Sequence, residues 1–471
     1  MSAPEEAMTT TKERQPPPPN LKRGPSPKVA PGPRDLGSLL DVMRDRLRLL
    51  ERTASEYGDV GTFRVGPTRL LYLLNHPDYV KQVLIDDPEN FRKGLGLHHA
   101  RKVLGDGLLT SQGELWKRHR KIIQPSFHHA RVATFVDVIV EETEAMLARW
   151  RERSRAVSLD IGAEMTRLTL GVLGRTLLAA DLTTDAWIGE AFHVVQEQAM
   201  LDMSTLGMIP HWAPLPQTNK FRAAKRALEV YVQELIDGKH SLPDGDGQDM
   251  LTRLLDAYRD EPDERLRFRR LRDELVTMLL AGHETTSSTL SWTWYLLNDA
   301  PEAVERVRAE AVAVLGDRAP QLADLAELRY TKQVVQEAMR LYPPVWAITR
   351  RNIETTHIAG YRLAPDTDIM ISPYLLHRHP GFWDEPLRFD PDRFDPQREK
   401  GRHGGAYVPF GAGPRFCAGS NLGMAEAQLV LAMVAREWGL KLVPGSDVVP
   451  QTMLALRMRG HLNMTLHPVR N

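Results

Sequence analysis

The chain has 471 residues, 42% of them hydrophobic, which is enough to build a large buried core. Its 61 basic and 61 acidic residues balance, so no overall positive field is available to hold nucleic acid or an anionic membrane surface. The single cysteine excludes internal disulfides and zinc sites built from several cysteines.

The first 35 residues are polar and proline-rich, without the apolar stretch of a signal peptide. Such a segment cannot bury enough apolar surface to offset its ordering entropy, so residues 1–35 are expected to form a disordered tail. The composition favours a cytoplasmic, reducing setting. Residues 36–471 show no internal linker and are expected to form a single domain.

Helical spacing over residues 36–57 is followed by two short strands, 60–65 and 70–74, joined at Gly66-Pro67. Helical patterns then dominate. They are expected over residues 132–150, 165–178, 221–236, 249–258, 271–297 and 331–341.

The C-terminal part combines short strand-like runs at 358–363 and 369–372 with proline-rich loops at 379–400. A last helix is expected from near Cys417 toward Trp438. Together these patterns predict a mainly helical fold with small β-sheets.

The longest helical pattern, residues 271–297, has about the length of a membrane span. Its middle, residues 283–289 (HETTSST), is seven successive polar residues, which would be very costly at bilayer depth. We therefore expect a long helix through the core of a soluble protein and no membrane anchor.

The lone cysteine lies in residues 410–419 (FGAGPRFCAG), between a glycine-rich loop and a helical pattern. A lone cysteine is most often a small buried hydrophobic residue. Here, however, its sulfur would lie near a helix N-terminus, where backbone N–H groups and the helix dipole favour the thiolate. The glycines would let a flat cofactor approach the backbone, and Arg415 offers a partner for a carboxylate.

This segment resembles the cysteine loop of the cytochrome P-450 superfamily, Phe-x-x-Gly-x-Arg-x-Cys-x-Gly. Phe410, Gly413, Arg415, Cys417 and Gly419 match all five fixed positions. The resemblance implies that Cys417 is the proximal iron ligand of a haem b cofactor, whose thiolate favours O–O cleavage. It also implies that Arg415 pairs with a haem propionate and that Phe410 packs near the thiolate.

A second motif is Ala281-Gly-His-Glu-Thr-Thr286 in the long helix. Taken alone, such hydroxyls most simply bond to carbonyls one turn earlier. The segment also resembles the superfamily's oxygen-activation motif, Ala/Gly-Gly-x-Asp/Glu-Thr-Thr/Ser. The resemblance implies that Gly282 opens the helix locally where dioxygen binds, that Thr285 hydrogen-bonds the bound oxygen, and that Glu284 connects it to solvent protons.

Glu337 and Arg340 lie one helical turn apart and share a face. Alone they would be an ordinary surface ion pair of little energetic value. In the superfamily this motif forms a buried triad with an arginine from a Pro-x-Arg-Phe segment, here residues 391–394. The resemblance therefore implies that Glu337, Arg340 and Arg393 are structural and hold the cysteine loop in place.

Trp116 and Arg120 match the Trp-x-x-x-Arg pattern, whose polar tips reach a haem propionate in the superfamily. Arg350 sits where many members place another propionate partner, and Arg351 is its competitor for that role. The basic stretch at 117–121 fits either a solvated helix face or a docking face for an acidic electron donor. No flavin or NAD fingerprint occurs, so electrons are expected from a ferredoxin with its reductase, or from a flavodoxin.

The resemblance covers about residues 45 to 465 and implies a triangular helical prism with a β-rich side, of the soluble bacterial type. It implies a monooxygenase that inserts one oxygen atom from O2 into an apolar terpenoid, fatty acid, steroid or polyketide-like substrate. The expected pocket walls are a loop around residues 94–107, the region 200–215, and residues 280–281 and 345–348. Two alternatives stay open: a peroxide-using or rearranging haem-thiolate enzyme, which Glu284 and Thr285 argue against, and a non-enzymatic haem sensor.

Overall fold

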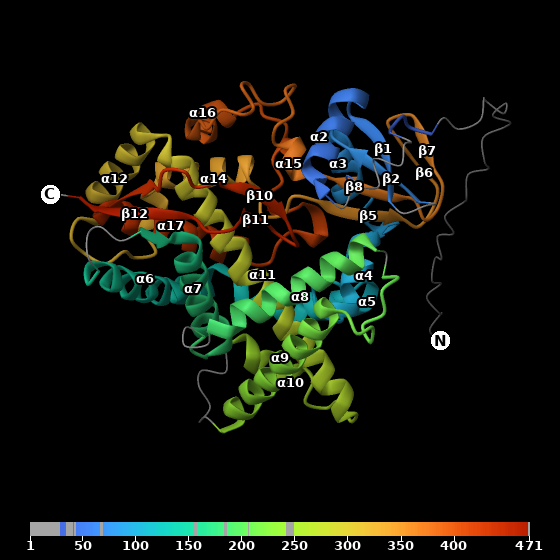
Figure 1. The fold of residues 1–471 in the computed structure, drawn as a ribbon, viewed down its shortest axis with the longest axis horizontal. Coiled ribbons are helices and arrows are strands. Elements are labelled where there is room, and N and C mark those ends of the chain that lie inside the picture. The colour runs from blue at the N-terminus through green and yellow to red at the C-terminus, as the bar shows by residue number, and fades with distance from the viewer. Residues whose placement is uncertain are drawn as a thin grey trace, which may run out of the picture.

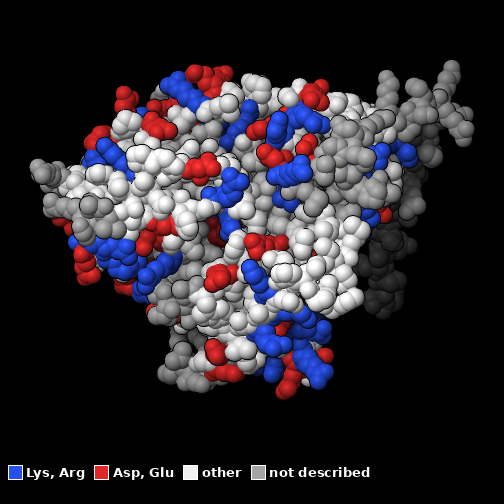
Figure 2. All heavy atoms as spheres, in the orientation of Figure 1, with Lys and Arg blue, Asp and Glu red and all other residues white. Residues whose placement is uncertain are grey.

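The computed structural model describes residues 29–33, 41, 44–65, 69–153, 158–182, 186–205, 207–241 and 249–469. Helices make up most of it, and small sheets lie toward opposite ends (Figure 1). The predicted mainly helical fold with small β-sheets is confirmed. On the face drawn in Figure 2, acidic and basic side chains are interspersed, in keeping with their equal numbers in the sequence.

The described α-helices range from single turns to the 35-residue helix α11. They are α2 (Arg46–Tyr57), α3 (Pro77–Lys81), α4 (Leu95–Leu104), α5 (Gly113–Ile123), α6 (His129–Arg151), α7 (Ile161–Leu173), α8 (Ala186–Ser204), α9 (Pro216–Ser241), α10 (Met250–Ala257), α11 (Glu264–Asn298), α12 (Pro301–Leu315), α13 (Asp324–Glu327), α14 (Arg329–Leu341), α15 (Pro373–Leu376), α16 (Pro396–Glu399) and α17 (Ser420–Glu437). Short 3-10 turns occupy Pro391–Phe394 and Gly413–Arg415, where two of the sequence motifs lie.

The described strands are short. They are β1 (Val60–Val65), β2 (Arg69–Leu74), β3 (Phe91–Lys93), β4 (Ser158–Asp160), β5 (Ile348–Asn352), β6 (Thr356–Ile358), β7 (Tyr361–Leu363), β8 (Asp368–Ile371), β9 (Trp438–Leu442), β10 (Val449–Thr452), β11 (Leu456–Arg459) and β12 (Asn463–Pro468). One sheet has the order β1-β2-β8-β5-β3, with only β2 and β8 parallel; β4-β12-β9 form another, and β10-β11 and β6-β7 pair as hairpins.

The run at 358–363, predicted as one strand, is instead the β6–β7 hairpin. The chain reverses at Ala359 and Gly360, which have φ values of 51° and 77°. Two successive residues with positive φ are the mark of the tight turns that fit the twist of a hairpin, and Gly360 adopts this conformation without strain.

Part of the predicted N-terminal tail is folded. The backbone N–H of Thr62 in β1 donates to the carbonyl of Pro31 at 2.8 Å, and Ala30 is only 1% exposed. The folded part therefore includes residues 29–33, which lie within the segment predicted to be disordered. The rest of that segment, and the predicted junction at Gly66-Pro67, fall outside the described residues.

Helix α11 crosses the middle of the molecule (Figure 1). Asp263 caps its N-terminus by accepting from the N–H groups of Arg265 and Leu266. Most of its polar middle is buried, with hydroxyls bonded to carbonyls one turn back, as for Thr289 to the carbonyl of Thr285. Among the described helices, none combines the length and apolarity needed to cross a membrane.

Candidate active site

Cys417 lies between the Gly413–Arg415 turn and the N-terminus of α17. Its backbone N–H donates to the carbonyl of Phe410 at 3.0 Å, which closes the loop. Gly413 has a φ of 68°, and a Cβ there would lie 1.8 Å from the carbonyl oxygen of Leu84. Only glycine allows this loop to pack against the backbone at Leu84.

The Cys417 sulfur accepts hydrogen bonds from the backbone N–H groups of Gly419 and Ser420, at the start of α17. Burial raises the pKa of the Cys417 thiol, while these N–H groups and the charge of Arg120 pull that pKa down. Cys417 is nevertheless an exposed residue. Protein therefore packs densely around Cys417 without covering it, as suits a cysteine that binds a cofactor.

Helix α11 approaches the same region from another side. A Cβ built on Gly423, in the first turns of α17, would lie 3.6 Å from the Thr286 hydroxyl oxygen. Ala281 is exposed although it lies in the middle of α11, and Thr285 is half-buried. Cys417 and one face of the predicted oxygen-activation motif are thus accessible on neighbouring elements.

Three basic side chains cluster near the cysteine loop: Lys93 of β3, Arg350 of β5 and Arg415. Burial and the charge of Arg415 lower the pKa of Arg350 to about 10. Burial, Arg415 and Arg350 lower the pKa of Lys93 well below its usual value, with partial compensation from Glu274. Within the described residues, no protein carboxylate forms an ion pair with any of the three. Because buried like charges are unfavourable without an anion, this cluster is suited to bind one from outside the chain.

Sequence analysis left Arg350 and Arg351 as competitors, and the strand geometry separates them. Successive side chains of a strand point to opposite faces. Arg351 forms a bidentate pair with Asp368 at 2.9 and 2.7 Å. Among the described residues, the Arg350 side chain donates only to the carbonyl of Thr349. Arg350 is therefore the one that remains available to an external anion.

Trp116 and Arg120 lie on α5 beside this cluster. The Arg415 guanidinium lies over the Trp116 ring, 4.5 Å from its centroid. Arg120 donates to the carbonyl of Phe416 at 2.8 Å, so it reaches the cysteine loop itself. The structure brings Trp116, Arg120, Arg350, Arg415 and Cys417 into one neighbourhood.

Sequence analysis missed two features of this neighbourhood. Lys93 is one: a single lysine at a strand end belongs to no recognisable pattern. The other is a buried contact between the His119 ring of α5 and the Glu274 carboxyl group of α11, with side chains 2% and 0% exposed. Only the odd placement of Glu274 at the start of an apolar helical run could have signalled it.

Glu284 and Thr285 are adjacent on α11 but face different surroundings. The Thr285 hydroxyl donates to the carbonyl of Ala281 at 2.8 Å. Glu284 is buried, and this burial raises the pKa of its carboxyl to about 7, against the opposing effects of Arg457 and of a hydrogen bond with Gln196. A carboxyl group that titrates near neutrality can both give and take a proton there.

Gly282 has a packing reason of its own. A Cβ at this position would lie 2.5 Å from the side chain of Leu173. Thr169, also on α7, donates to the carbonyl of His283 at 3.1 Å. Glycine therefore allows α7 to pack closely against α11 at the predicted oxygen-activation motif.

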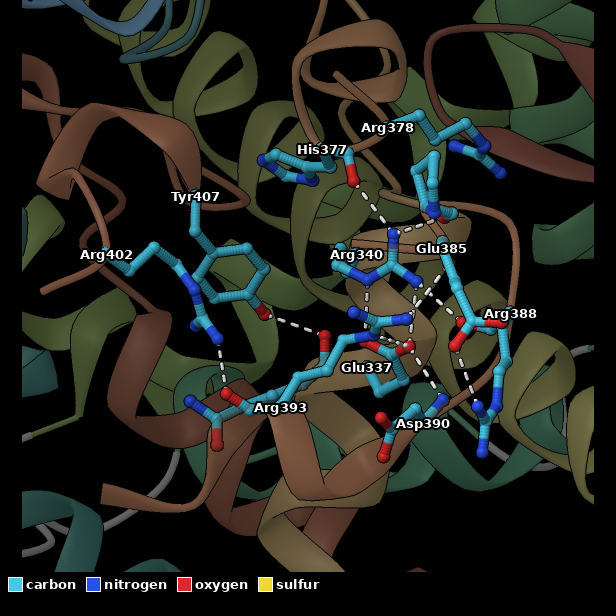
Figure 3. Close-up of polar contacts among 12 residues, drawn as sticks. Glu337, Arg340, His377, Arg378, Glu385, Arg388, Asp390, Arg393, Arg402 and Tyr407 are labelled. Carbon is cyan, nitrogen blue, oxygen red and sulfur yellow. Dashed lines mark hydrogen bonds and ion pairs between the residues drawn. The ribbon is translucent and has the colours of Figure 1, made fainter. Parts of the chain in front are cut away.

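Glu337, Arg340 and Arg393 meet in a buried cluster (Figure 3). Arg340 donates to both carboxylate oxygens of Glu337, at 2.6 and 2.7 Å, and both side chains are 0% exposed. Arg393 lies 3.5 Å from the same carboxylate. Burial raises the pKa of Glu337, and the two arginines oppose this rise.

This cluster is linked to the cysteine loop through His377. Arg340 donates to the His377 carbonyl at 2.9 Å, and the backbone N–H of Val408 donates to His377 Nε2 at 2.9 Å. Burial lowers the pKa of His377 to about 3, so the ring stays neutral and can accept that bond. Val408 precedes Phe410 by two residues, and Phe410 in turn accepts from Cys417. Hydrogen bonds and the short backbone segment between Val408 and Phe410 therefore connect the Glu337 cluster to Cys417.

Comparison with known proteins agrees with this geometry. The family model described as Cytochrome P450 matches residues 29–464. The chain belongs to the cytochrome P450 family. Cyclooctatin synthase of Streptomyces melanosporofaciens is 38% identical to this P450 over 445 residues, covering 93% of this chain and 95% of the relative. Cyclooctat-9-en-7-ol 5-monooxygenase of the same organism is 35% identical, with 94% of each chain covered. Pentalenene oxygenase of Streptomyces avermitilis is 31% identical, with 92% and 95% covered.

P450 chains are haem-dependent monooxygenases, and the residues of this P450 fit that cofactor. Haem brings two propionate groups, and the cluster of buried Lys93 and Arg350 with half-buried Arg415 has no protein anion among the described residues. Haem iron needs an axial ligand, and Cys417 presents a sulfur at a helix N-terminus. As a member of this family, the protein requires a redox partner as electron donor, O2 and an apolar substrate.

The segments predicted to wall the substrate pocket also come together. Residues 94–107, expected as a loop, are largely the helix α4, which is flanked by Gly94 and Gly105. A Cβ at Gly96 of α4 would lie 2.8 Å from Met203 of α8, and one at Gly107 would lie 2.2 Å from the Thr277 hydroxyl of α11. The backbone N–H of Gly94 donates to the carbonyl of Thr349 in β5. Helix α4 is therefore packed among α8, α11 and β5.

Proposed function

We propose that this P450 hydroxylates or epoxidises a cyclic terpenoid. The names of two relatives refer to cyclooctat-9-en-7-ol and to pentalenene, and both names denote unsaturated and largely apolar carbon skeletons. The predicted pocket walls support such a substrate, since they include Met200, Leu280, Trp346 and Ile348, which are apolar.

The observation that carries the proposal is the site around Cys417. Haem ligated by a thiolate supplies the activation of O2 and the insertion of one oxygen atom into a C–H or C=C bond. Cys417 would be the axial ligand, held by the N–H groups of Gly419 and Ser420. Lys93, Arg350 and Arg415 would hold the propionates, with Trp116 and Arg120 beside them.

Glu284 and Thr285 would deliver protons to the reacting oxygen. A carboxyl with a pKa of about 7 can give its proton toward the Thr285 hydroxyl and take another from solvent. The Thr285 hydroxyl, which donates to the carbonyl of Ala281, would turn from it to pass that proton on. Gln196 orients the Glu284 carboxyl by its hydrogen bond.

The electrons would come from a ferredoxin with its reductase, or from a flavodoxin, in the cytoplasm. Lys117 and Lys121 are exposed on α5, and Arg120 of the same helix binds the loop that carries Cys417. An acidic donor attracted to this face would therefore dock near the predicted haem ligand.

The test is a substrate screen by optical titration of the ferric protein, which reports displacement of the water ligand by its change of spin state. Cyclic terpenoid hydrocarbons should give the strongest response, fatty acids a weaker one and small polar compounds none. With ferredoxin, reductase and NADPH, the responsive terpenoid should gain one oxygen atom, and Thr285→Ala should divert reducing equivalents to peroxide. A strongest response to a polar or anionic ligand would contradict the proposal.

A further inference from the structure

Among the described residues, one charged side chain acts on Glu284, and it comes from a distant part of the chain. Arg457 of β11 acts on the Glu284 carboxylate and pulls its pKa down, against the larger effect of burial. Gln196 of α8 supplies a hydrogen bond, and no described residue forms a hydrogen bond with Glu284 Oε1. A buried oxygen left without a partner in such a place can be served by water.

Helix α11 itself fixes the position of Arg457. The Ser288 hydroxyl donates to the carbonyl of Leu456 at 2.6 Å, and the Trp292 indole N–H donates to the same carbonyl at 3.1 Å. Ser288 follows Glu284 by four residues and so lies on the same helix face. The residue before Arg457 is therefore anchored one turn from Glu284.

The Arg457 guanidinium acts on Glu284 through its charge, while its printed hydrogen bonds go to α8 and to β10. Its Nη2 donates to His193 Nδ1 at 2.9 Å, and its Nε lies 3.4 Å from Gln451 Oε1 on the paired strand β10. His193 Nε2 lies 3.3 Å from Glu197 Oε1, and these two side chains are 36% and 40% exposed. A line of polar groups thus runs from the buried Glu284 to the surface of α8.

Arginine has donors only, so His193 Nδ1 must be unprotonated to accept from Arg457. Burial, followed by the charge of Arg457, lowers the pKa of His193, while Glu197 and Glu190 raise it. At neutral pH the ring is therefore neutral and holds Arg457 on the α8 side. Protonation of His193 would replace this hydrogen bond by repulsion between two cations.

We propose that Arg457, held by neutral His193, is the positioning residue that sets the charge of Glu284 and keeps its path to solvent open between α8 and the β10–β11 hairpin. The inference rests on the proton-delivery role proposed for Glu284. While His193 holds Arg457, Glu284 can carry a proton, pass it toward Thr285 and take another from water at the surface. When His193 is protonated or absent, Arg457 pairs with Glu284, which stays ionised and stops donating.

The other charged groups act on the α8 side of this arrangement. Among the described residues, Arg457 is the one charged side chain that acts on Glu284, while Glu197 acts on both Arg457 and His193, and Glu190 acts on His193. The neighbouring His283 is neutral, since burial lowers its pKa to about 4. Arg457 and His193 therefore determine in which direction each substitution shifts the titration midpoint of Glu284.

The test is an infrared titration of the haem-loaded protein, which follows the carbonyl stretch of the protonated Glu284 carboxyl. The band is assigned by its loss in Glu284→Gln. Arg457→Leu should raise the Glu284 midpoint by about 1 to 3 pH units, because an opposite charge is removed at close range. His193→Phe should lower it by about one unit, because Arg457 is released toward the carboxylate. Arg457→Lys keeps the positive charge, so it separates the effect of the lost charge in Arg457→Leu from an effect of lost packing.

Arg459→Leu is the matched control. It makes the same change two residues along β11, at an exposed arginine that lies 3.7 Å from Asp447, and should leave the Glu284 midpoint unchanged. A Glu284 midpoint that does not move in either Arg457→Leu or His193→Phe overturns this inference alone. Donor-driven turnover and peroxide release that are unaltered in Glu284→Gln would instead overturn the proton-delivery role on which the inference rests.

Discussion

Replacing Arg340 by methionine measures how strongly the buried cluster stabilises the fold around the cysteine loop. The variant keeps most of the side-chain volume but leaves Glu337, which is 0% exposed, with Arg393 at 3.5 Å and the backbone N–H of Asp390 at 2.9 Å. Removing one partner of a buried ion pair costs about 3–5 kcal/mol. Arg340 also donates to the carbonyls of His377, Pro386 and Arg388, and the loss of each of these hydrogen bonds costs about 1 kcal/mol of stability. Protonation of Glu337 relieves part of the charge penalty, so the expected loss is about 4 kcal/mol.

The assay is equilibrium urea unfolding of the haem-loaded protein at fixed protein concentration, followed by circular dichroism and by haem absorbance. The matched control is Arg388→Met, in the same loop, whose side chain forms an exposed pair with Glu385. This control should leave the urea midpoint unchanged. A loss below about 1 kcal/mol in Arg340→Met, with an unchanged denaturant slope, would refute the reasoning from buried charge.

Three further predictions follow from single positions. Gly413→Ala should destabilise the protein by about 3 kcal/mol or more in thermal unfolding, because the new Cβ would lie 1.8 Å from the Leu84 carbonyl oxygen. The control is Gly411→Ala, which has a similar φ but open space around it and should cost about 1 kcal/mol. Arg350→Leu should speed the transfer of haem to a haem acceptor by about tenfold or more, because the variant loses one hydrogen bond to a charged group. Arg351→Leu, whose arginine pairs with Asp368, should leave that rate unchanged. The carboxyl of Glu284 has a pKa raised to about 7, so the folded state holds this proton more tightly than the unfolded chain. The Glu284 carboxyl should therefore contribute fully to stability below about pH 4.3, and this contribution should fall by up to about 3 kcal/mol as the pH rises to 7. The measurement is the free energy of unfolding as a function of pH, and this pH dependence should vanish in Glu284→Gln.

Much of the helical framework could be predicted from the sequence. The apolar period places both ends of α6 within three residues of their observed positions, and the end of α11 within one, since their buried faces repeat over several turns. Helix α11 nevertheless begins at Glu264, seven residues before its predicted start. The segment now seen as α4 was expected to be a loop, because its flanking glycines signal turns while its helical period covers few residues. Strands β9 to β12 were not predicted, because they are short and their pairing with β4 and with each other depends on distant segments.

The site divides in the same way. Cys417, Glu284 and Glu337 lie in motifs whose spacing is local, so the sequence alone could point to them. Lys93 and Arg457 lie in ordinary-looking segments and reach the site only through tertiary packing. The choice between Arg350 and Arg351 needed the strand register and the position of Asp368, which no local pattern contains.

The most direct test of this account is the absorption difference spectrum of the reduced protein with carbon monoxide. If Cys417 ligates the haem iron as a thiolate, the complex should show the strongly red-shifted Soret band of that ligation, and Cys417→Ala should lose it. A band typical of histidine ligation in the unaltered protein, or the same red-shifted band in Cys417→Ala, would contradict the account.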